Sequence, residues 1–245
     1  MVAAAAREIR DGETVFVGMR LPLLAFCLAK ETHAPEAIGL YENGVVRATP
    51  SPELLYTMSD PPNLLGATRC TEMLGVMGPL AAGRVDLGFL GAAQADRFGN
   101  LNSTEVRPPG GGIVRLPGSG GACDIASLAR RFVVLLEHKR HRFPERVDYV
   151  TSPGFLRGGK SREEAGLVRG GPSAVITTLG VLRFDPESRE AFLDSIHPGA
   201  DLESLLRETG FPLRTRDPLP TTTPPSEEEL AILRRYDPEG FWTGD

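Results

Sequence analysis

The chain has 245 residues, of which 41% are hydrophobic and 24% are charged, with a formal net charge of -5 at pH 7. This length and composition predict a soluble globular protein with a sizeable core. The negative charge excludes the broad basic surface that a nucleic-acid partner requires. Charge interrupts the apolar N-terminus after six residues and no apolar run is long enough to span a bilayer, so we expect neither a signal peptide nor a membrane segment.

The three cysteines are widely spaced and form no Cys-x-x-Cys arrangement: Cys27, Cys70 and Cys123. This pattern argues against a disulfide framework and against a zinc site. We therefore expect three packing residues and a reducing, cytoplasmic compartment.

The N-terminal part of the chain alternates between helical and strand-like segments. We expect helices at 2–10 and 21–30, and strands at 14–19, 38–41 and 85–90. This alternation predicts an α/β fold, an open and mostly parallel sheet flanked by helices.

The middle of the chain continues the pattern, with a helix at 125–131, strands at 132–137 and 147–151, and a strand pair at 174–184 around Gly180. No composition change interrupts it before His197. We predict one domain over residues 1–196.

The sequence pattern changes at residues 197–245, which are expected to form a C-terminal tail packed on the same domain. The tail begins at His197-Pro198-Gly199 and contains a short helix and a Pro-rich run. A last helix opens at Ser226-Glu-Glu-Glu, which is the pattern of a capping box.

The first segment that could take part in catalysis is Glu42-Asn43-Gly44, which follows a predicted strand. Asn-Gly between apolar runs is a strong hairpin signal, and Glu42 could simply lie on the solvent face of such a hairpin. The functional interpretation is a carboxylate at the C-terminal end of a strand, where ligands bind in open α/β sheets. A carboxylate in a dry cleft can act as a covalent nucleophile.

The second segment runs from Gly118 to Asp124 and contains Gly118, Gly120 and Gly121. Its glycines allow a tight turn whose backbone N–H groups face an anion or a developing oxyanion. The spacing is neither that of a phosphate loop nor that of a dinucleotide fingerprint. The simpler interpretation is a tight loop in which Asp124 is a helix N-cap.

The third segment, Gly91 to Thr104, carries three side-chain amides that suit hydrogen bonding to a carboxylate or a thioester carbonyl: Gln94, Asn100 and Asn102. Asn100 is equally an ordinary turn former. The fourth, Glu137 to Arg142, is a basic run that could meet a phosphate group or form a solvated edge. His138 and His141 lack a third ligand, so we expect no metal site.

These motifs, in this order and spacing, resemble the β subunit of class I coenzyme A transferases, especially the glutaconate and 3-oxoacid types. The family's Glu-x-Gly motif matches Glu42 and Gly44, and its Gly-x-Gly-Gly-Ala-x-Asp loop matches Gly118 to Asp124. Its Gly-Ala-x-Gln segment with a following Gly-Asn matches Gly91 to Thr104. The resemblance covers most of the chain.

The resemblance implies that Glu42 is the catalytic glutamate and that Gly120 or Gly121 donates a backbone N–H to the oxyanion. It places Asn100 or Asn102 near the acyl or carboxylate group. It implies coenzyme A as a substrate, no permanently bound cofactor, and transfer through a glutamyl-CoA thioester.

It also implies a homologous α subunit, in an αβ pair or a dimer of such pairs, with acyl-CoA and carboxylate substrates. A thioester hydrolase or ring-opening hydrolase subunit of the same fold is the alternative. A non-catalytic binding subunit, in which Glu42 only closes a hairpin, is a further one.

Overall fold

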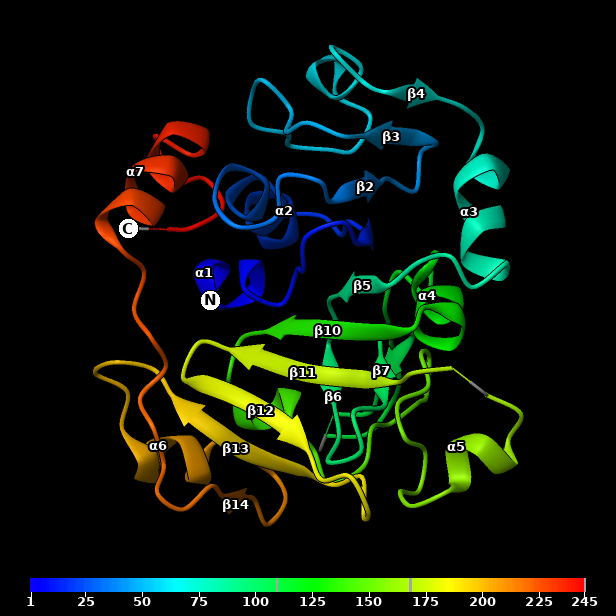
Figure 1. Cartoon of the computed structure of the whole chain (residues 1–245). Helices are drawn as coiled ribbons and strands as arrows, with labels where there is room; N and C mark the ends of the chain where they lie inside the picture. Colours follow the sequence, from blue (N-terminus) through cyan, green and yellow to red (C-terminus); the bar gives the residue numbers. More distant parts are fainter. Residues whose placement is uncertain (109, 168, 245) are drawn as a thin grey trace. The chain divides into compact units, whose positions relative to one another are not determined.

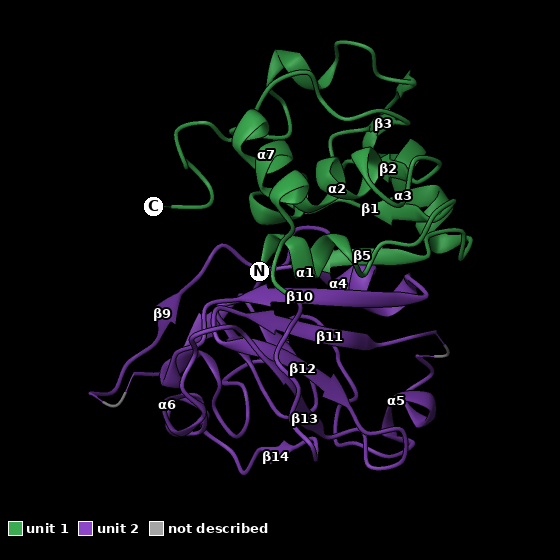
Figure 2. Cartoon of the chain, turned by 60° about the vertical axis from the view of Figure 1, so that its left-hand side comes forward, with its two compact units in different colours: residues 1–89, 224–245 green, residues 90–223 purple. Residues whose placement is uncertain are grey.

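The computed structural model describes residues 1–108, 110–167 and 169–244 (Figure 1). Contacts group the chain into two compact units (Figure 2). Unit 1 comprises Met1–Phe89 with Pro224–Asp245, and unit 2 comprises Leu90–Thr223. Of the tail expected at 197–245, residues 197–223 belong to unit 2 and residues 224–245 to unit 1.

Unit 1 contains four helices, a 3-10 turn and five strands among its described residues. The helical elements are α1 (Val2–Ala6), α2 (Leu21–Glu31), η1 (Pro61–Asn63), α3 (Met73–Ala81) and α7 (Glu227–Tyr236). The strands are β1 (Thr14–Phe16), β2 (Ile38–Leu40), β3 (Val45–Arg47), β4 (Arg69–Cys70) and β5 (Leu87–Leu90). Their order across the sheet is β5-β1-β2-β3-β4.

The strand directions in unit 1 decide where its loops gather. β1 is parallel to both β5 and β2, whereas β3 and β4 are antiparallel additions. Phe16 pairs with Leu40, and the N–H of Val17 donates to the Leu40 carbonyl at 2.9 Å. The carboxyl ends of β1 and β2 therefore open on the same sheet edge, which is where open α/β sheets bind ligands.

Helix α2 supplies much of the core of unit 1. Nine of its eleven residues are buried, because it packs against α1, α7 and the sheet. Gly39 in β2 leaves room for the Phe26 ring, which would lie 2.8 Å from a Cβ at that position. Helix α7 begins with the predicted capping box, in which Ser226 and Glu229 satisfy each other's backbone N–H groups.

Unit 2 is built on the strand order β14-β13-β12-β11-β10. These strands are β10 (Arg131–Leu136), β11 (Pro172–Thr177), β12 (Gly180–Phe184), β13 (Ala191–Ile196) and β14 (Arg214–Thr215). Two small ribbons accompany them: β6 (Gln94–Ala95) with β7 (Leu101–Asn102), and β8 (Glu105–Val106) with β9 (Val114–Arg115). The helical elements are α4 (Ala122–Leu128), η2 (Arg140–Arg142), α5 (Ser161–Glu164) and α6 (Leu202–Arg207).

The α/β class predicted from the sequence is confirmed, and parallel and antiparallel pairs both occur in it. Several predicted elements differ. The helix expected at 2–10 ends at Ala6, and the strand expected at 14–19 ends at Phe16. The strand expected at 147–151 is wrong, because only Ser152 forms an isolated bridge, with Leu101, while Tyr149 and Val150 stay exposed. The helix expected at 125–131 begins earlier, at Ala122. Among the described residues no helix is long and apolar enough to cross a membrane.

Candidate active site

Glu42 lies in a tight turn between β2 and β3, at the carboxyl end of β2. The Tyr41 N–H donates to the Val45 carbonyl and the Gly44 N–H donates to the Tyr41 carbonyl, both at 2.9 Å. The hairpin expected from Asn43-Gly44 is therefore present. Glu42 itself is half-buried.

Gly44 is required by its surroundings. Its φ is +97°, and a Cβ there would lie 1.9 Å from the Thr71 carbonyl oxygen, a distance that no real Cβ reaches. The Thr71 N–H donates to the Gly44 carbonyl at 2.9 Å. The Glu-x-Gly spacing thus has a physical cause: only glycine lets the turn that carries Glu42 approach the backbone after β4.

The other side of the turn is held by the segment 48–68, which Arg47 anchors. Arg47 is 1% exposed and donates to four backbone carbonyls of that segment, at 2.6 to 3.0 Å. Asn43 and Asn63 both donate side-chain N–H groups to the Met58 carbonyl, at 2.6 and 2.7 Å. The residue next to Glu42 is therefore tied to a loop that a buried guanidinium organises.

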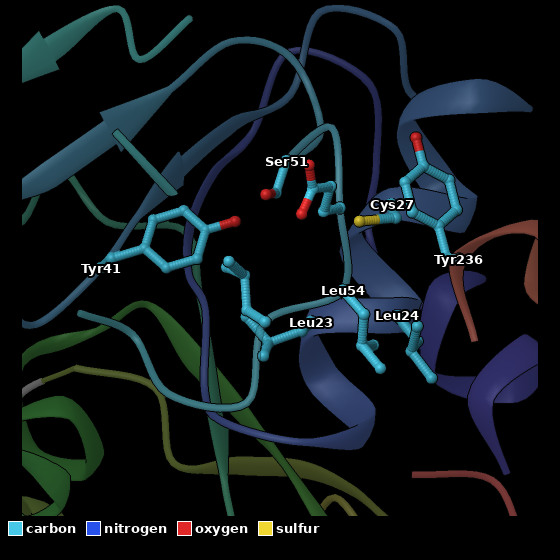
Figure 3. Close-up of a pocket in the computed structure, with 9 residues that line it drawn as sticks. Leu23, Leu24, Cys27, Tyr41, Ser51, Leu54 and Tyr236 are labelled. Carbon is cyan, nitrogen blue, oxygen red and sulfur yellow. The ribbon is translucent and has the colours of Figure 1, made fainter. Parts of the chain in front are cut away.

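Beneath the turn, Tyr41 is 1% exposed and meets the Phe26 ring edge-on at 6.5 Å. Tyr41 lines a cavity of about 10 Å³, the room of about one water molecule. Figure 3 shows Cys27 and Ser51 around the same cavity. Burial raises the pKa of the Cys27 thiol to about 12 and also raises the pKa of Tyr41. Cys27 therefore stays a protonated packing residue.

In unit 2 all three predicted amides are buried, and two of them, Gln94 and Asn102, form one hydrogen-bonded framework. The pairing of β6 with β7 sets Gln94 opposite Asn102, and the Asn102 side-chain N–H donates to the Gln94 side-chain oxygen at 2.8 Å. Asn102 also donates to the Glu105 carbonyl at 2.6 Å, and Gln94 donates to Asp148 at 2.9 Å. These polar atoms are therefore occupied within the chain.

The Asn100 side chain is 2% exposed and forms a separate set of hydrogen bonds. Its side-chain N–H groups donate to the Asp96 carboxylate and, at 2.8 Å, to the Leu156 carbonyl. Its side-chain oxygen accepts from the Gly154 and Leu156 N–H groups at 2.9 and 3.1 Å. Burial raises the pKa of Asp96, against the opposing effect of these hydrogen bonds. Asn100 thus fixes a loop, and its contact with substrate stays a prediction.

The glycine loop is fastened to this amide framework by Ser103. The Gly118 N–H donates to the Ser103 carbonyl, and the Ser103 hydroxyl donates to the Gly118 carbonyl, both at 2.8 Å. Ser103 directly follows Asn102. The structure therefore brings two sequence-predicted segments together through Ser103.

Within that loop, Gly120 differs from its neighbours. It is exposed, has a φ of +49°, and its N–H meets no acceptor among the described residues. Gly121 is buried and caps α4. The predicted N-cap role of Asp124 is wrong, because α4 begins at Ala122 and Asp124 lies inside its first turn.

Glu42 belongs to unit 1, and the amides and the glycine loop belong to unit 2.

The side chains of the basic run, Glu137 to Arg142, mostly bind other residues of unit 2. Glu137 pairs with Lys139 at 2.6 Å, and Arg140 donates to two carbonyls at the end of α6. His138 is buried between two threonine hydroxyls, and burial lowers its pKa to about 4. The described residues hold no cluster of three or more metal-binding side chains.

Two arginines of unit 1 were not predicted from the sequence. Arg47 could have been noticed as a charge that ends a buried β-branched strand. Arg20, whose φ is +69°, carried no local signal, because backbone conformation at a non-glycine residue is invisible in a single sequence.

The chain belongs to the coenzyme A transferase family, whose model matches residues 1–207. It is 36% identical over 245 residues to the B-type subunit of 3-oxoadipate CoA-transferase from Pseudomonas knackmussii, covering 97% of this chain and 91% of that protein. These findings confirm the family that the motif order predicted.

Solved structures agree on the fold. Glutaconate coenzyme A-transferase from Acidaminococcus fermentans superposes with a TM-score of 0.90 at 29% identity, covering 98% of this chain and 94% of that one. The decarboxylase AibA/AibB superposes with a TM-score of 0.85 at 28% identity, covering 100% and 97%. Because one of these structures is called a decarboxylase, the fold by itself does not define the reaction.

Proposed function

We propose that this chain is the B-type subunit of a heteromeric CoA-transferase and that Glu42 is its nucleophile. The observation that carries the proposal is the turn at the carboxyl end of β2, which Gly44 and the Asn43–Met58 contact hold from two sides. A turn held in this way fixes the backbone that carries the Glu42 side chain before substrate arrives, and such preorganisation favours nucleophilic catalysis.

In the proposed reaction the Glu42 carboxylate attacks the thioester carbonyl of an acyl-CoA. The coenzyme A thiolate leaves, and a mixed anhydride joins the acyl group to Glu42. The thiolate then attacks the glutamyl carbonyl, which releases the acyl group as a free carboxylate and leaves a glutamyl-CoA thioester. An acceptor carboxylate takes the coenzyme by the reverse steps.

Each tetrahedral intermediate carries negative charge on oxygen and needs a hydrogen-bond donor. We assign that role to the backbone N–H of Gly120, because it is the exposed N–H of the glycine loop that meets no acceptor among the described residues. One such donor typically lowers the barrier by about 3 to 4 kcal/mol. Ser103, which directly follows Asn102, then fastens the start of this loop at Gly118.

The partner in this proposal is an A-type subunit, in an αβ pair or a dimer of such pairs. It is supported by the 3-oxoadipate relative, whose name makes it one of the lettered subunits of its enzyme. Coenzyme A is a substrate here, and no permanently bound cofactor is proposed. Three unpaired cysteines suit a reducing cytoplasm.

The test uses the chain co-expressed with an A-type CoA-transferase subunit. The assembled protein is incubated with an acyl-CoA and no acceptor, and then analysed by peptide mass spectrometry with and without borohydride. We expect a borohydride-sensitive CoA adduct on Glu42 and none in Glu42→Gln.

Two outcomes would overturn the proposal. Release of free acid and coenzyme A without an acceptor, undiminished in Glu42→Gln, indicates the hydrolase alternative. Equal transfer rates for wild type and Glu42→Ala indicate a non-catalytic subunit. The hydrolase is the less favoured alternative, since the 3-oxoadipate relative is part of a transferase.

A further inference from the structure

The Ser51 hydroxyl is a buried polar group that the chain itself leaves without a hydrogen bond. Ser51 is 3% exposed, and its Oγ meets no donor or acceptor among the described residues. In the unfolded chain water satisfies such a hydroxyl, so burying it without a partner costs free energy. Folded proteins usually satisfy buried polar groups with other residues or with ordered water.

The Tyr41 hydroxyl is in the same situation, at the same cavity. Tyr41 is 1% exposed, and no described residue forms a hydrogen bond with its hydroxyl. Figure 3 shows the Tyr41 and Ser51 side chains pointing toward each other across the cavity, which Cys27 also lines. Tyr236 lines it as well, but its hydroxyl donates to the Glu31 carboxylate. Tyr41 and Ser51 are therefore the two hydroxyls that remain to be satisfied there.

The size and the charge of the cavity limit what can bind in it. Its volume of about 10 Å³ admits about one water molecule and nothing larger. Burial raises the pKa of the Cys27 thiol to about 12 and also raises the pKa of Tyr41, so both groups are uncharged at neutral pH. A neutral ligand that can donate and accept hydrogen bonds suits these groups.

We propose that this cavity binds one ordered water molecule, which bridges the Tyr41 and Ser51 hydroxyls. With the weak donor of the Cys27 thiol the water has three partners, the usual number for a buried water. Tyr41 directly precedes Glu42, and Ser51 belongs to the segment 48–68. The bridge therefore ties the turn that carries Glu42 to this segment, in addition to the contact between Asn43 and the Met58 carbonyl. The inference does not depend on the role of Glu42 as a nucleophile.

The first experiment is a crystal structure of the assembled heteromer at a resolution that shows ordered water. We expect one density peak in the cavity, about 2.7 to 3.0 Å from the Tyr41 and Ser51 oxygens. A cavity without such a peak overturns the proposal. A direct hydrogen bond between the two hydroxyls overturns it as well, because no water then bridges them.

The second experiment measures melting temperatures of the same heteromer with single hydroxyls removed. Ser51→Ala and Tyr41→Phe are each expected to lower the melting temperature by about 2 to 4 °C, the shift for one hydrogen bond at this chain length. Ser59→Ala and Tyr56→Phe are matched controls, because they remove exposed hydroxyls from the same segment. The controls are expected to shift it by about 1 °C or less.

The sign of the shift distinguishes a hydrated cavity from a dry one. In a dry cavity Ser51→Ala removes a buried polar atom that has no partner, so the melting temperature stays the same or rises, and this result overturns the proposal. The double variant adds a further check. Because either deletion breaks the bridge, its shift is expected to be smaller than the sum of the two single shifts, and additive shifts contradict a shared water.

Discussion

Substituting Gly44 with alanine tests whether the turn that carries Glu42 is as tightly confined as the structure indicates. The new Cβ would lie 1.9 Å from the Thr71 carbonyl oxygen, whereas ordinary contacts begin at 3.4 Å. The backbone after β4 must move, and the hydrogen bond from the Thr71 N–H to Gly44 is lost. Overpacking of this kind costs about 1 to 3 kcal/mol, and the lost hydrogen bond about 1 kcal/mol more.

Gly12→Ala is the control for backbone strain. Gly12 has a φ of +75°, and a Cβ there meets nothing within 4 Å. Both variants carry the strain of a positive φ, about 1 to 2 kcal/mol, but only Gly44→Ala carries the clash. At this chain length each kcal/mol shifts the melting temperature by roughly 2 to 4 °C, so Gly44→Ala is expected to melt about 4 to 16 °C below Gly12→Ala.

The same pair of variants tests the link to activity. A displacement of about 1 Å at a reacting group can lower the rate by about 100-fold. We therefore expect Gly44→Ala to lose coenzyme A transfer by about that factor in the assembled protein, and Gly12→Ala to retain it. Equal melting temperatures for the two variants would refute the confinement of the turn.

Three further predictions concern stability and reactivity. Arg47→Met leaves four backbone carbonyls, that of the buried Asn63 among them, without their donor, and it is expected to lower the free energy of unfolding by roughly 3 kcal/mol. The exposed Arg84→Met is expected to change it little, and denaturant titration measures both. Burial holds His138 neutral in the folded state, with a pKa of about 4 against 6.5. Its contribution is therefore complete above pH 6.5 and falls by about 3 kcal/mol as the pH drops from 6.5 to 4. The melting temperature should therefore depend less on pH between 4 and 6.5 in His138→Gln than in the wild type. An equal pH dependence in the two proteins contradicts the role given to His138. Iodoacetamide at pH 8 is expected to label the exposed Cys70 of the folded chain and to spare Cys27, whose thiol has a pKa of about 12; peptide mapping that finds the reverse overturns the burial argument.

Local sequence signals predicted several elements correctly. Asn43-Gly44 between apolar runs predicted the hairpin of β2 and β3, and Ser226 with Glu229 predicted the start of α7. These signals work because a turn type or a capping box depends on a few adjacent residues. The predicted strand at 147–151 failed for the converse reason: a strand needs a neighbour, and there the fold supplies only one bridge.

The amides show the limit of residue chemistry as a guide. Gln94 and Asn102 were predicted beside the substrate because amides suit carboxylates and thioester carbonyls. In the fold their partners are each other and Asp148, which lies 54 residues from Gln94. A side chain of the right type can thus be occupied by a distant partner that no local pattern reveals.

The sequence by itself determined the family and the order of its motifs, and it placed Glu42 at the end of a strand. The tertiary structure decided why that position is confined, because the contact of Gly44 with Thr71 joins residues that follow different strands. It also revealed the buried Arg47, whose hydrogen bonds organise the loop that the Asn43 side chain contacts. Local patterns specify turns and caps, whereas a site depends on contacts between distant segments, and only the folded chain brings these together.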